Sequence, residues 1–241
     1  MSITPHAPSS YSPADLRQAI IRRFLQLGLY IAVQATILFA AAGRWEWPMA
    51  WVYLGMYLGV IALLSLLILP RNPELVAERS QMKENTKSWD KVFSVVYTIC
   101  GLSVLLVAGL DQRGGWSPPF PAWLMGSGVG VLMAGWALLV WAMTTNRFFS
   151  SVVRIQTDRG HTVVSSGPYQ FVRHPGYVSM MVSALGAIAM FGSVWAVIPT
   201  VLLISLVIVR TALEDQTLQN ELPGYKDYAA RVRYRLLPGV W

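Results

Sequence analysis

Polar and ionisable residues gather in two short stretches in the C-terminal third of an otherwise apolar chain. The first, residues 156–177, contains His161 and His174, and the second begins at Arg210 and includes Glu214. The apolar run that separates the two stretches carries no charged side chain. Ionisable groups at the ends of such a run usually face a polar cavity instead of lipid. These two stretches are therefore the first candidates for a functional site.

Proline and glycine residues indicate how the first stretch is built. Gly167-Pro168 and Pro175-Gly176 interrupt helix formation, and Pro175 suits the first position of a new helix while disfavouring a helical conformation for His174. His174 is therefore expected just before a helix N-terminus, where free N–H groups and the positive helix end can bind a carboxylate or phosphate. The alternative is that Arg173 and His174 only mark a membrane boundary.

In the second stretch, Arg210 and Glu214 are four residues apart and share a face if the segment is helical. The plain interpretation of this spacing is a surface ion pair, although Arg before Glu is the less favourable order. Their position at the membrane exit of a charge-free run favours a polar cavity over an exposed pair.

Composition indicates an integral membrane protein. The chain has 241 residues, of which 54% are hydrophobic and 13% charged, and a mean hydropathy of +0.46. The net charge of +7 comes from basic residues dispersed among short loops, which is typical of membrane topology and argues against nucleic acid as a partner. The single cysteine, Cys100, excludes an intramolecular disulfide and a thiolate metal site. We expect no metal.

Apolar runs of about 20 residues predict an all-α, polytopic membrane protein with about six transmembrane helices. A flexible tail is expected at residues 1–15, and four spans within residues 16–145. Gln26 and Gln34 interrupt the first run, which argues against a cleaved signal peptide. The remaining residues, 146–241, form a core with a helical hairpin. The expected spans are the apolar runs at residues 24–43, 47–69, 92–110, 122–145 and 177–213. The last run is expected to form the two helices of the hairpin, with the turn indicated by Gly192, Ser193 and Pro199.

Six spans place both termini on the same side of the membrane. The segments then expected to be cytoplasmic carry seventeen Lys and Arg residues, whereas the opposite loops carry only Arg44 and Arg113. Because basic residues accumulate in cytoplasmic loops, both polar stretches should lie at the cytoplasmic face. A cofactor pocket formed there by the C-terminal third is the expected site.

Several motifs in order carry a resemblance over residues 156–241. They are His161-Thr-Val-Val-Ser-Ser-Gly-Pro-Tyr169, then Arg173-His174-Pro175-Gly176-Tyr177, then Arg210 with Glu214-Asp215 and Leu218, and finally Gly224-Tyr225 with Tyr228. This region resembles the isoprenylcysteine carboxyl methyltransferase family and its phospholipid methyltransferase relatives. The segment Arg71-Asn-Pro-Glu-Leu-Val-Ala-Glu-Arg79 also resembles bacterial members, which implies a bacterial inner membrane.

The resemblance implies methyl transfer from S-adenosylmethionine to a lipophilic acceptor that enters from the bilayer. By matching position, Glu214 contacts the cofactor and Arg210 the acceptor carboxylate, so that these two residues are the expected catalytic pair. The resemblance implies a cofactor pocket lined by Gln156, His161, Thr162, Val163, Val164, Gly167, Tyr169, Arg173, His174, Pro175, Gly176, Tyr177 and Glu214.

The expected reaction is O-methylation of a prenylcysteine-like carboxylate, which needs no general base because it is ionised at neutral pH. S-methylation of a small thiol and N-methylation of a phospholipid amine are alternatives, and both require a deprotonating group. A non-catalytic transporter or scaffold is the alternative of another class. A transporter should show polar or broken residues near mid-membrane. The last two runs lack charges there and the earlier runs offer only the scattered Gln34, Thr36, Ser65 and Ser103, which favours the enzyme. The oligomeric state stays open.

Overall fold

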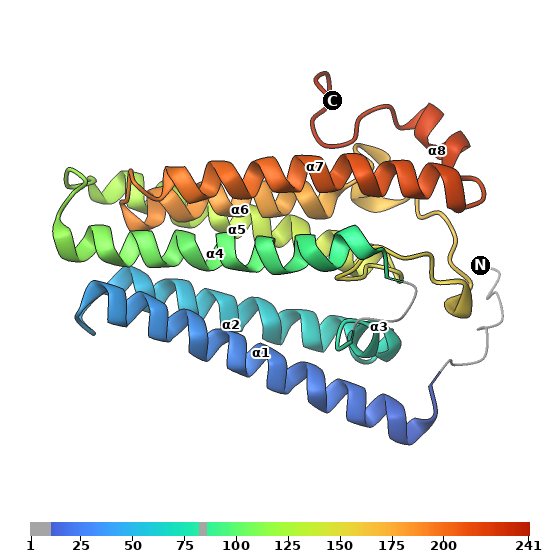
Figure 1. Cartoon of the computed structure of the whole chain (residues 1–241), viewed down its shortest axis with the longest axis horizontal. Coiled ribbons are helices and arrows are strands. Elements are labelled where there is room, and N and C mark those ends of the chain that lie inside the picture. Colours follow the sequence, from blue (N-terminus) through green and yellow to red (C-terminus); the bar gives the residue numbers. More distant parts are fainter. Residues whose placement is uncertain (1–10, 82–85) are drawn as a thin grey trace.

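Helices form all the regular secondary structure of the described residues, 11–81 and 86–241, in this computed structural model. Figure 1 shows the long helices lying side by side, with the short helices α3 and α8 at one end. We call this the loop end, and the opposite end, with residues 43–47, 115–121 and 192–196, the turn end. The helices are α1 (Pro13–Ala42), α2 (Pro48–Ile68), α3 (Pro73–Glu78), α4 (Ser88–Gly114), α5 (Ala122–Thr145), α6 (Pro175–Phe191), α7 (Val197–Glu221) and α8 (Tyr225–Arg231). Two 3-10 turns, η1 (Thr157–Arg159) and η2 (Gly167–Gln170), lie between α5 and α6.

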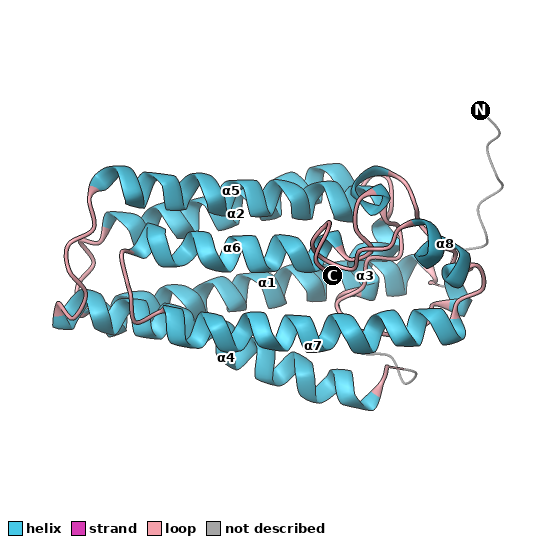
Figure 2. Ribbon diagram, turned by 90° about the horizontal axis from the view of Figure 1, so that it is seen from above, coloured by secondary structure: helices cyan, strands magenta, loops and turns pink. Residues whose placement is uncertain are grey.

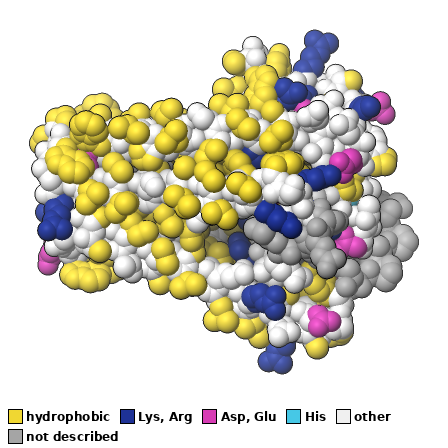
Figure 3. All heavy atoms as spheres, in the orientation of Figure 1, with side chains coloured by type: hydrophobic (Ala, Val, Ile, Leu, Met, Phe, Trp, Pro, Cys, Tyr) yellow, Lys and Arg dark blue, Asp and Glu magenta, His cyan; other side chains and the backbone are white. Residues whose placement is uncertain are grey.

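Five of these helices, α1, α2, α4, α5 and α7, are long and apolar enough to cross a membrane. The shorter apolar helix α6 lies beside them in the bundle (Figure 2). Hydrophobic side chains cover the middle of the face seen in Figure 3, and Lys and Arg side chains gather mainly towards the loop end. The protein is therefore an all-helical, multi-pass membrane protein, as its sequence predicts.

Several helix boundaries differ from those that hydropathy predicts. Ser12 caps α1 by accepting a hydrogen bond from the Asp15 N–H at 3.2 Å, so residues 13–15, expected in the flexible tail, are helical. Residues 1–10 of that tail lie outside the described residues. Helix α4 begins at Ser88, before its apolar run, and α7 continues to Glu221, beyond it. Hydropathy cannot detect such polar helical extensions, because they lie outside the hydrocarbon layer.

The predicted hairpin between α6 and α7 is present. Gly192 ends α6 in the left-handed conformation, with φ of 66°, which glycine adopts without strain. Ser193 follows in the turn, and its hydroxyl donates a hydrogen bond to the buried carboxylate of Asp111 at the end of α4. Pro199 was expected in the turn, but it lies in the first turn of α7, where proline is tolerated because its missing N–H would have no partner.

Glycines allow α5 and α6 to pack against each other at close range. A Cβ atom at Gly186 of α6 would lie 2.5 Å from the Leu132 nitrogen, and one at Gly128 of α5 would lie 2.7 Å from the Ala189 carbonyl carbon. Small residues at a helix interface permit this approach in membranes, where lipid provides no hydrophobic drive for association. The α5–α6 pair is therefore a rigid unit on which the start of α6 is placed.

Helices α1 and α4 pack closely only near the turn end. There a Cβ atom at Gly109 would lie 2.7 Å from the Ala41 Cβ atom. Towards the loop end the two helices diverge, which both Figure 1 and Figure 2 show. Side chains of α1 and α4 in this diverging part, including Tyr30 and Tyr97, line a large cavity. The bundle is thus closed at one end and hollow at the other.

Candidate active site

The site is built around the start of α6. His174 precedes the helix and Pro175 occupies its first turn, as the sequence predicts. The backbone N–H groups of Arg173 and His174 donate to the carbonyl oxygens of Tyr234 and Arg235, at 2.9 and 3.0 Å. The C-terminal segment therefore runs alongside the residues that lead into α6 and fixes their direction.

Asp215 on α7 connects α6, α7 and the C-terminal segment. Its buried carboxylate accepts hydrogen bonds from Arg173, at 2.8 and 3.0 Å, and from Arg235, at 2.9 Å. The Tyr225 hydroxyl donates to the same carboxylate at 3.1 Å, and His174 Nε2 lies 3.3 Å from it. The guanidinium of Arg173 also donates to backbone carbonyls of the C-terminal segment. Arg173 and His174 thus both line the cavity, and their side-chain nitrogen atoms contact the Asp215 carboxylate and stabilise the cavity wall.

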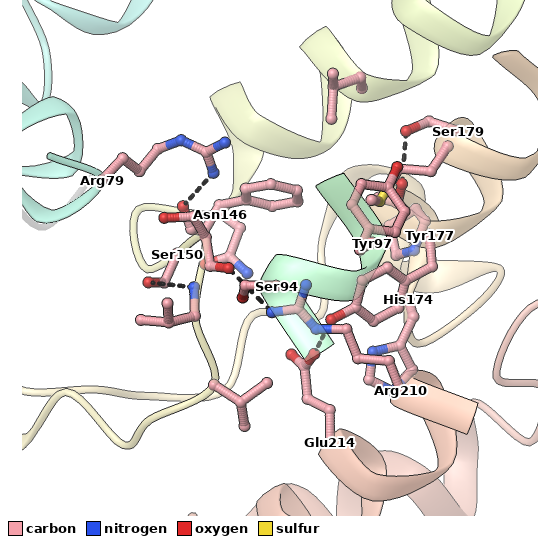
Figure 4. Close-up of a pocket in the computed structure, with 18 of the residues that line it drawn as sticks. Arg79, Ser94, Tyr97, Asn146, Ser150, His174, Tyr177, Ser179, Arg210 and Glu214 are labelled. Carbon is pink, nitrogen blue, oxygen red and sulfur yellow. Dashed lines mark hydrogen bonds between the residues drawn. The ribbon is translucent and has the colours of Figure 1, made fainter. Parts of the chain in front are cut away.

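Glu214, one residue before Asp215, points to the other side of the α6 start. Its carboxylate accepts a hydrogen bond from the Tyr177 hydroxyl. The Tyr177 ring lies between two neighbours: its centroid is 5.6 Å from the His174 ring centroid and 5.6 Å from the Arg210 guanidinium carbon. Figure 4 shows Tyr177, Arg210 and Glu214 converging on the same region of the cavity.

Arg210 pairs with Asp90 of α4, and not with Glu214 as their four-residue spacing suggests. Arg210 Nη2 lies 3.0 Å from Asp90 Oδ1 and donates to the Ser151 carbonyl oxygen at 3.0 Å. The guanidinium also lies over the Phe93 ring, 4.8 Å from its centroid. Its Nε atom is buried without a hydrogen-bond partner among the described residues. Arg210 therefore keeps an unused donor while Asp90 balances its charge.

His161 lines the cavity as a neutral imidazole. Its Nδ1 atom accepts a hydrogen bond from the Gln156 N–H at 3.3 Å, so the ring proton must lie on Nε2. Burial, together with the positive charges of Arg154 and Arg159, lowers the pKa of His161 to about 4. At neutral pH the ring is therefore a hydrogen-bond donor at Nε2 and carries no charge.

Gln156 holds the loop that precedes η1. Its side chain donates to the Phe148 carbonyl oxygen at 2.7 Å and accepts from Arg159 Nη1 at 2.5 Å. The residue lines the cavity, with both ends of its amide already bonded within the protein. Its predicted contact with a cofactor would have to share these bonds.

A short helix that sequence reasoning missed holds this loop in place. The sequence assigns no role to the loop expected at residues 72–91, but this segment contains α3, and Glu78 of α3 forms a buried ion pair with Arg154 at 2.6 and 2.9 Å. Burial alone would lower the pKa of Arg154, but Glu78 and Asp158 raise it above its ordinary value. Removing one member of a buried pair is costly, so α3 anchors the loop firmly.

His161, Tyr177, Arg210 and Glu214 line one cavity with a volume of about 770 Å³. Every sequence-predicted site residue except Gly167 lines it. Gly167 has a φ of 58°, and a Cβ atom there would lie 2.8 Å from Thr145 Oγ1, so its role is to form a tight turn against α5. No sequence pattern singled out Asp90, Arg79 or Asn146 as residues of the site. Asn146 directly follows the last residue of α5. Arg79 and Asn146 line the cavity as well, because α3 and the end of α5 close the loop end.

The cavity has two parts of different character. At the loop end, Val163, Val164 and Tyr169 pack with Leu218 and Leu222 as an apolar and aromatic wall. From there the cavity passes Arg210 and continues between the diverging helices α1 and α4 into the bundle. The cavity can therefore hold a polar molecule with a planar ring at the loop end, and an elongated molecule that extends towards the membrane interior.

Comparison with known proteins finds a family model that matches the part of the chain that carries this site. Residues 128–220 match the model of the isoprenylcysteine carboxyl methyltransferase (ICMT) family. Over this region, the chain is similar to the ICMT family. The match covers most of α5, all of α6 and α7 up to residue 220, and α6 and α7 carry Tyr177, Arg210 and Glu214.

A solved structure with a similar fold is that of a eukaryotic intramembrane Ras methyltransferase, itself an ICMT. The two chains are 23% identical, the TM-score is 0.59, and the likeness covers 90% of this chain and 75% of the other. At this level of identity the likeness concerns the fold. No curated protein matches the chain significantly in sequence.

Proposed function

We propose that this protein transfers a methyl group from S-adenosylmethionine to the carboxylate of a lipophilic acceptor. The observation that carries the proposal is the position of Glu214 and Arg210 in one cavity, which joins a polar, aromatic loop end to the interior of the bundle. An enzyme that transfers a group from a polar cofactor to a lipid needs one cavity that both molecules can reach.

The residues at the loop end fit S-adenosylmethionine, which supplies an activated methyl group on a sulfonium centre. Glu214 would hold its ammonium group, since Asp90 already balances the charge of Arg210 and Glu214 leaves this wall net negative. The start of α6 would hold its carboxylate through the Gly176 N–H, because Pro175 has no N–H and the Tyr177 N–H already donates to the His174 carbonyl oxygen. The wall of Val163, Val164 and Tyr169 suits the adenine ring, and His161 Nε2–H can donate to one of its polar groups.

The acceptor carboxylate would lie at Arg210. The partnerless Nε atom of this residue is a buried donor that requires an acceptor oxygen, and a carboxylate provides one. Arg79 lies across the cavity, where its guanidinium donates to the Phe149 carbonyl oxygen at 3.3 Å and packs over the Phe149 ring (Figure 4). A second cation at the same cavity suits an anionic acceptor.

The geometry favours a carboxylate over a thiol or an amine. Those two acceptors need a group that removes a proton. Of the two histidines in the cavity wall, His174 lies against Asp215, and His161 uses its Nδ1 lone pair to accept from Gln156. A carboxylate requires no proton transfer, so catalysis would rest on orientation and on exclusion of water by the closed loop end.

The cavity is lined by α1 and α4, two helices long and apolar enough to cross a membrane, which supports entry of the acceptor from the bilayer. The accumulation of Lys and Arg residues at the loop end supports a cytoplasmic site with both termini on that side (Figure 3). Cysteine substitutions at Arg113 and Gln156, labelled with an impermeant reagent, should report opposite sides. Labelling of both from one side would contradict this orientation.

Two measurements test the proposal. Calorimetry of the detergent-purified protein should show saturable binding of S-adenosylmethionine, and radiolabelled methyl transfer to N-acetyl-S-farnesylcysteine should yield a base-labile ester. Transfer to a small thiol or to phosphatidylethanolamine, with none to the cysteine derivative, would replace the carboxylate by another acceptor. A folded sample without affinity for the cofactor would contradict the proposal as a whole.

A further inference from the structure

The wall that α1 contributes to the cavity is polar for a membrane-spanning helix. Arg23, Gln26, Tyr30 and Gln34 all line the cavity, and their spacing of three or four residues places them on one helix face. Gln34 lies eleven residues after Arg23, which corresponds to about 16 Å along the helix. Polar side chains within a membrane span rarely occur without a partner or a function. This face of α1 is therefore a candidate recognition surface.

Gln34 is the innermost of these residues and has an unsatisfied donor. Only 1% of its surface is exposed. Its Oε1 atom accepts a hydrogen bond from the Tyr53 hydroxyl at 2.8 Å, which fixes the orientation of the amide. Its Nε2 atom has no hydrogen-bond partner among the described residues. The Tyr57 hydroxyl lies close to the amide and is the competing acceptor for its N–H, although the two groups do not meet in good hydrogen-bonding geometry.

Tyrosines surround this amide and extend the polar surface. The Tyr30 and Tyr57 ring centroids are 6.3 Å apart, and those of Tyr53 and Tyr57 are 6.2 Å apart. Tyr97 reaches the cavity from α4, between this cluster and the region of Arg210 (Figure 4). Within the described residues, no hydrogen bond occupies the hydroxyl groups of Tyr30 and Tyr97. The inner part of the cavity thus offers several hydrogen-bonding groups at membrane depth.

We infer that the acceptor carries a hydrogen-bond-accepting oxygen in its distal part, and that this oxygen binds Gln34 Nε2. The inference rests on the proposed function, in which the reacting end of the acceptor lies at Arg210. A plain hydrocarbon tail would exclude water from the amide N–H and the tyrosine hydroxyl groups without offering them a hydrogen-bond partner. Each unmet group would weaken binding roughly fivefold to tenfold. The favoured class is therefore a lipid with a ketone, ester or ether in its tail, in contrast to a purely isoprenoid one.

Two probes of equal length test this preference. Both are N-acetyl-S-alkylcysteines with the same number of chain atoms, and one has a ketone near the far end of the chain. Calorimetry measures their dissociation constants with S-adenosylhomocysteine present, so that binding is compared without turnover. We expect the wild-type protein to bind the ketone probe about tenfold more tightly than the hydrocarbon probe.

Substitution of Gln34 should remove the preference. In Gln34→Leu we expect the two dissociation constants to become equal or to favour the hydrocarbon probe. The matched control is Thr36→Val on the same helix, since Thr36 is exposed and its hydroxyl donates to the Ala32 carbonyl oxygen. Tyr53→Phe provides a second variant that keeps the amide and removes only its positioning bond. In it the preference should fall about threefold, because the amide can then rotate.

The outcomes separate this inference from the proposed function. Equal affinities in the wild type, or a preference that survives both Gln34→Leu and Tyr53→Phe, would overturn the inference even if methyl transfer occurs. A ketone preference that Gln34→Leu abolishes would support the inference even if neither probe is methylated. In that case only the proposed carboxylate chemistry would fail.

Discussion

Two helix pairs of this protein meet in opposite ways. Along α5 and α6, glycines on both helices allow the backbones to touch, as at Gly128 and Gly186. Between α1 and α4, a single close approach at Gly109 gives way to a cavity lined by polar side chains. Helices α1, α4 and α5 are long and apolar enough to cross a membrane and α6 is a shorter apolar helix, and the two pairs differ in the side chains on their facing surfaces. Small residues join helices in lipid, and polar residues keep a cavity between them.

This contrast divides the expected effects of mutations. Substitutions in the α5–α6 contact should destroy the framework that positions α6, whereas substitutions in the open part of the cavity should change binding and leave the framework folded.

The largest effect is expected at Gly128. In Gly128→Leu the new side chain would collide with the backbone of Ala189 and Met190, which cannot move without separating α5 from α6. We expect no monodisperse protein after detergent extraction, measured by fluorescence-detected size exclusion. The matched control is Gly130→Leu, two residues along α5, where a Cβ atom would meet nothing within 4 Å. Normal yields from both variants would show that the close contact is dispensable.

The next largest effect is expected at Glu214. Glu214→Gln keeps the shape of the side chain but removes the charge proposed to bind the cofactor ammonium. We expect about a 100-fold loss of calorimetric affinity for S-adenosylmethionine, as for a lost charged hydrogen bond. The melting temperature without ligand should stay unchanged. Glu221→Gln on the same helix is the control, because its exposed carboxylate pairs only with Lys87 among the described residues. Full affinity in Glu214→Gln would contradict the assignment.

A moderate effect is expected from Arg210, provided that Asp90 is changed with it. Arg210→Gln alone leaves the buried Asp90 carboxylate without its partner, which costs about 3–5 kcal/mol and obscures any catalytic role. In Arg210→Gln with Asp90→Asn, both members of the ion pair are neutral and the helices can stay paired. We expect the cofactor affinity to remain and kcat/KM for the acceptor to fall roughly 30-fold. If the double variant instead loses the cofactor and keeps the acceptor KM, the roles of Arg210 and Glu214 are reversed.

The smallest effect is expected from the titration of His161. Its pKa is about 4 in the folded protein, against 6.5 ordinarily, so the unfolded chain binds a proton first as the pH falls. Stability should therefore be complete above about pH 6.5 and decrease towards pH 4, by on the order of 1 kcal/mol per pH unit. His161→Asn preserves an acceptor for the Gln156 N–H without titrating. Its melting temperature should fall less between pH 7 and pH 5, and parallel profiles would show that His161 does not sense pH.

The sequence predicted much of the site because the relevant signals are local. The Pro175 start of α6, the Gly192 turn and the grouping of His161, Tyr177, Arg210 and Glu214 all followed from motifs within short stretches. These residues line one cavity because the helices that carry them are consecutive and antiparallel. Local patterns also placed Gly167 in the pocket wall, where the structure shows a turn glycine.

By itself, the sequence determined the membrane class, the approximate number of spans and the family resemblance of the C-terminal third, because hydropathy, turn residues and motif order are properties of neighbouring residues. Only the tertiary structure decided which charges pair. Arg210 binds Asp90, 120 residues away, and Arg154 binds Glu78, 76 residues away. It also decided that Gln34, which merely interrupts an apolar run, faces a cavity. No local pattern encodes such contacts, since they depend on which helix faces meet after the chain has packed.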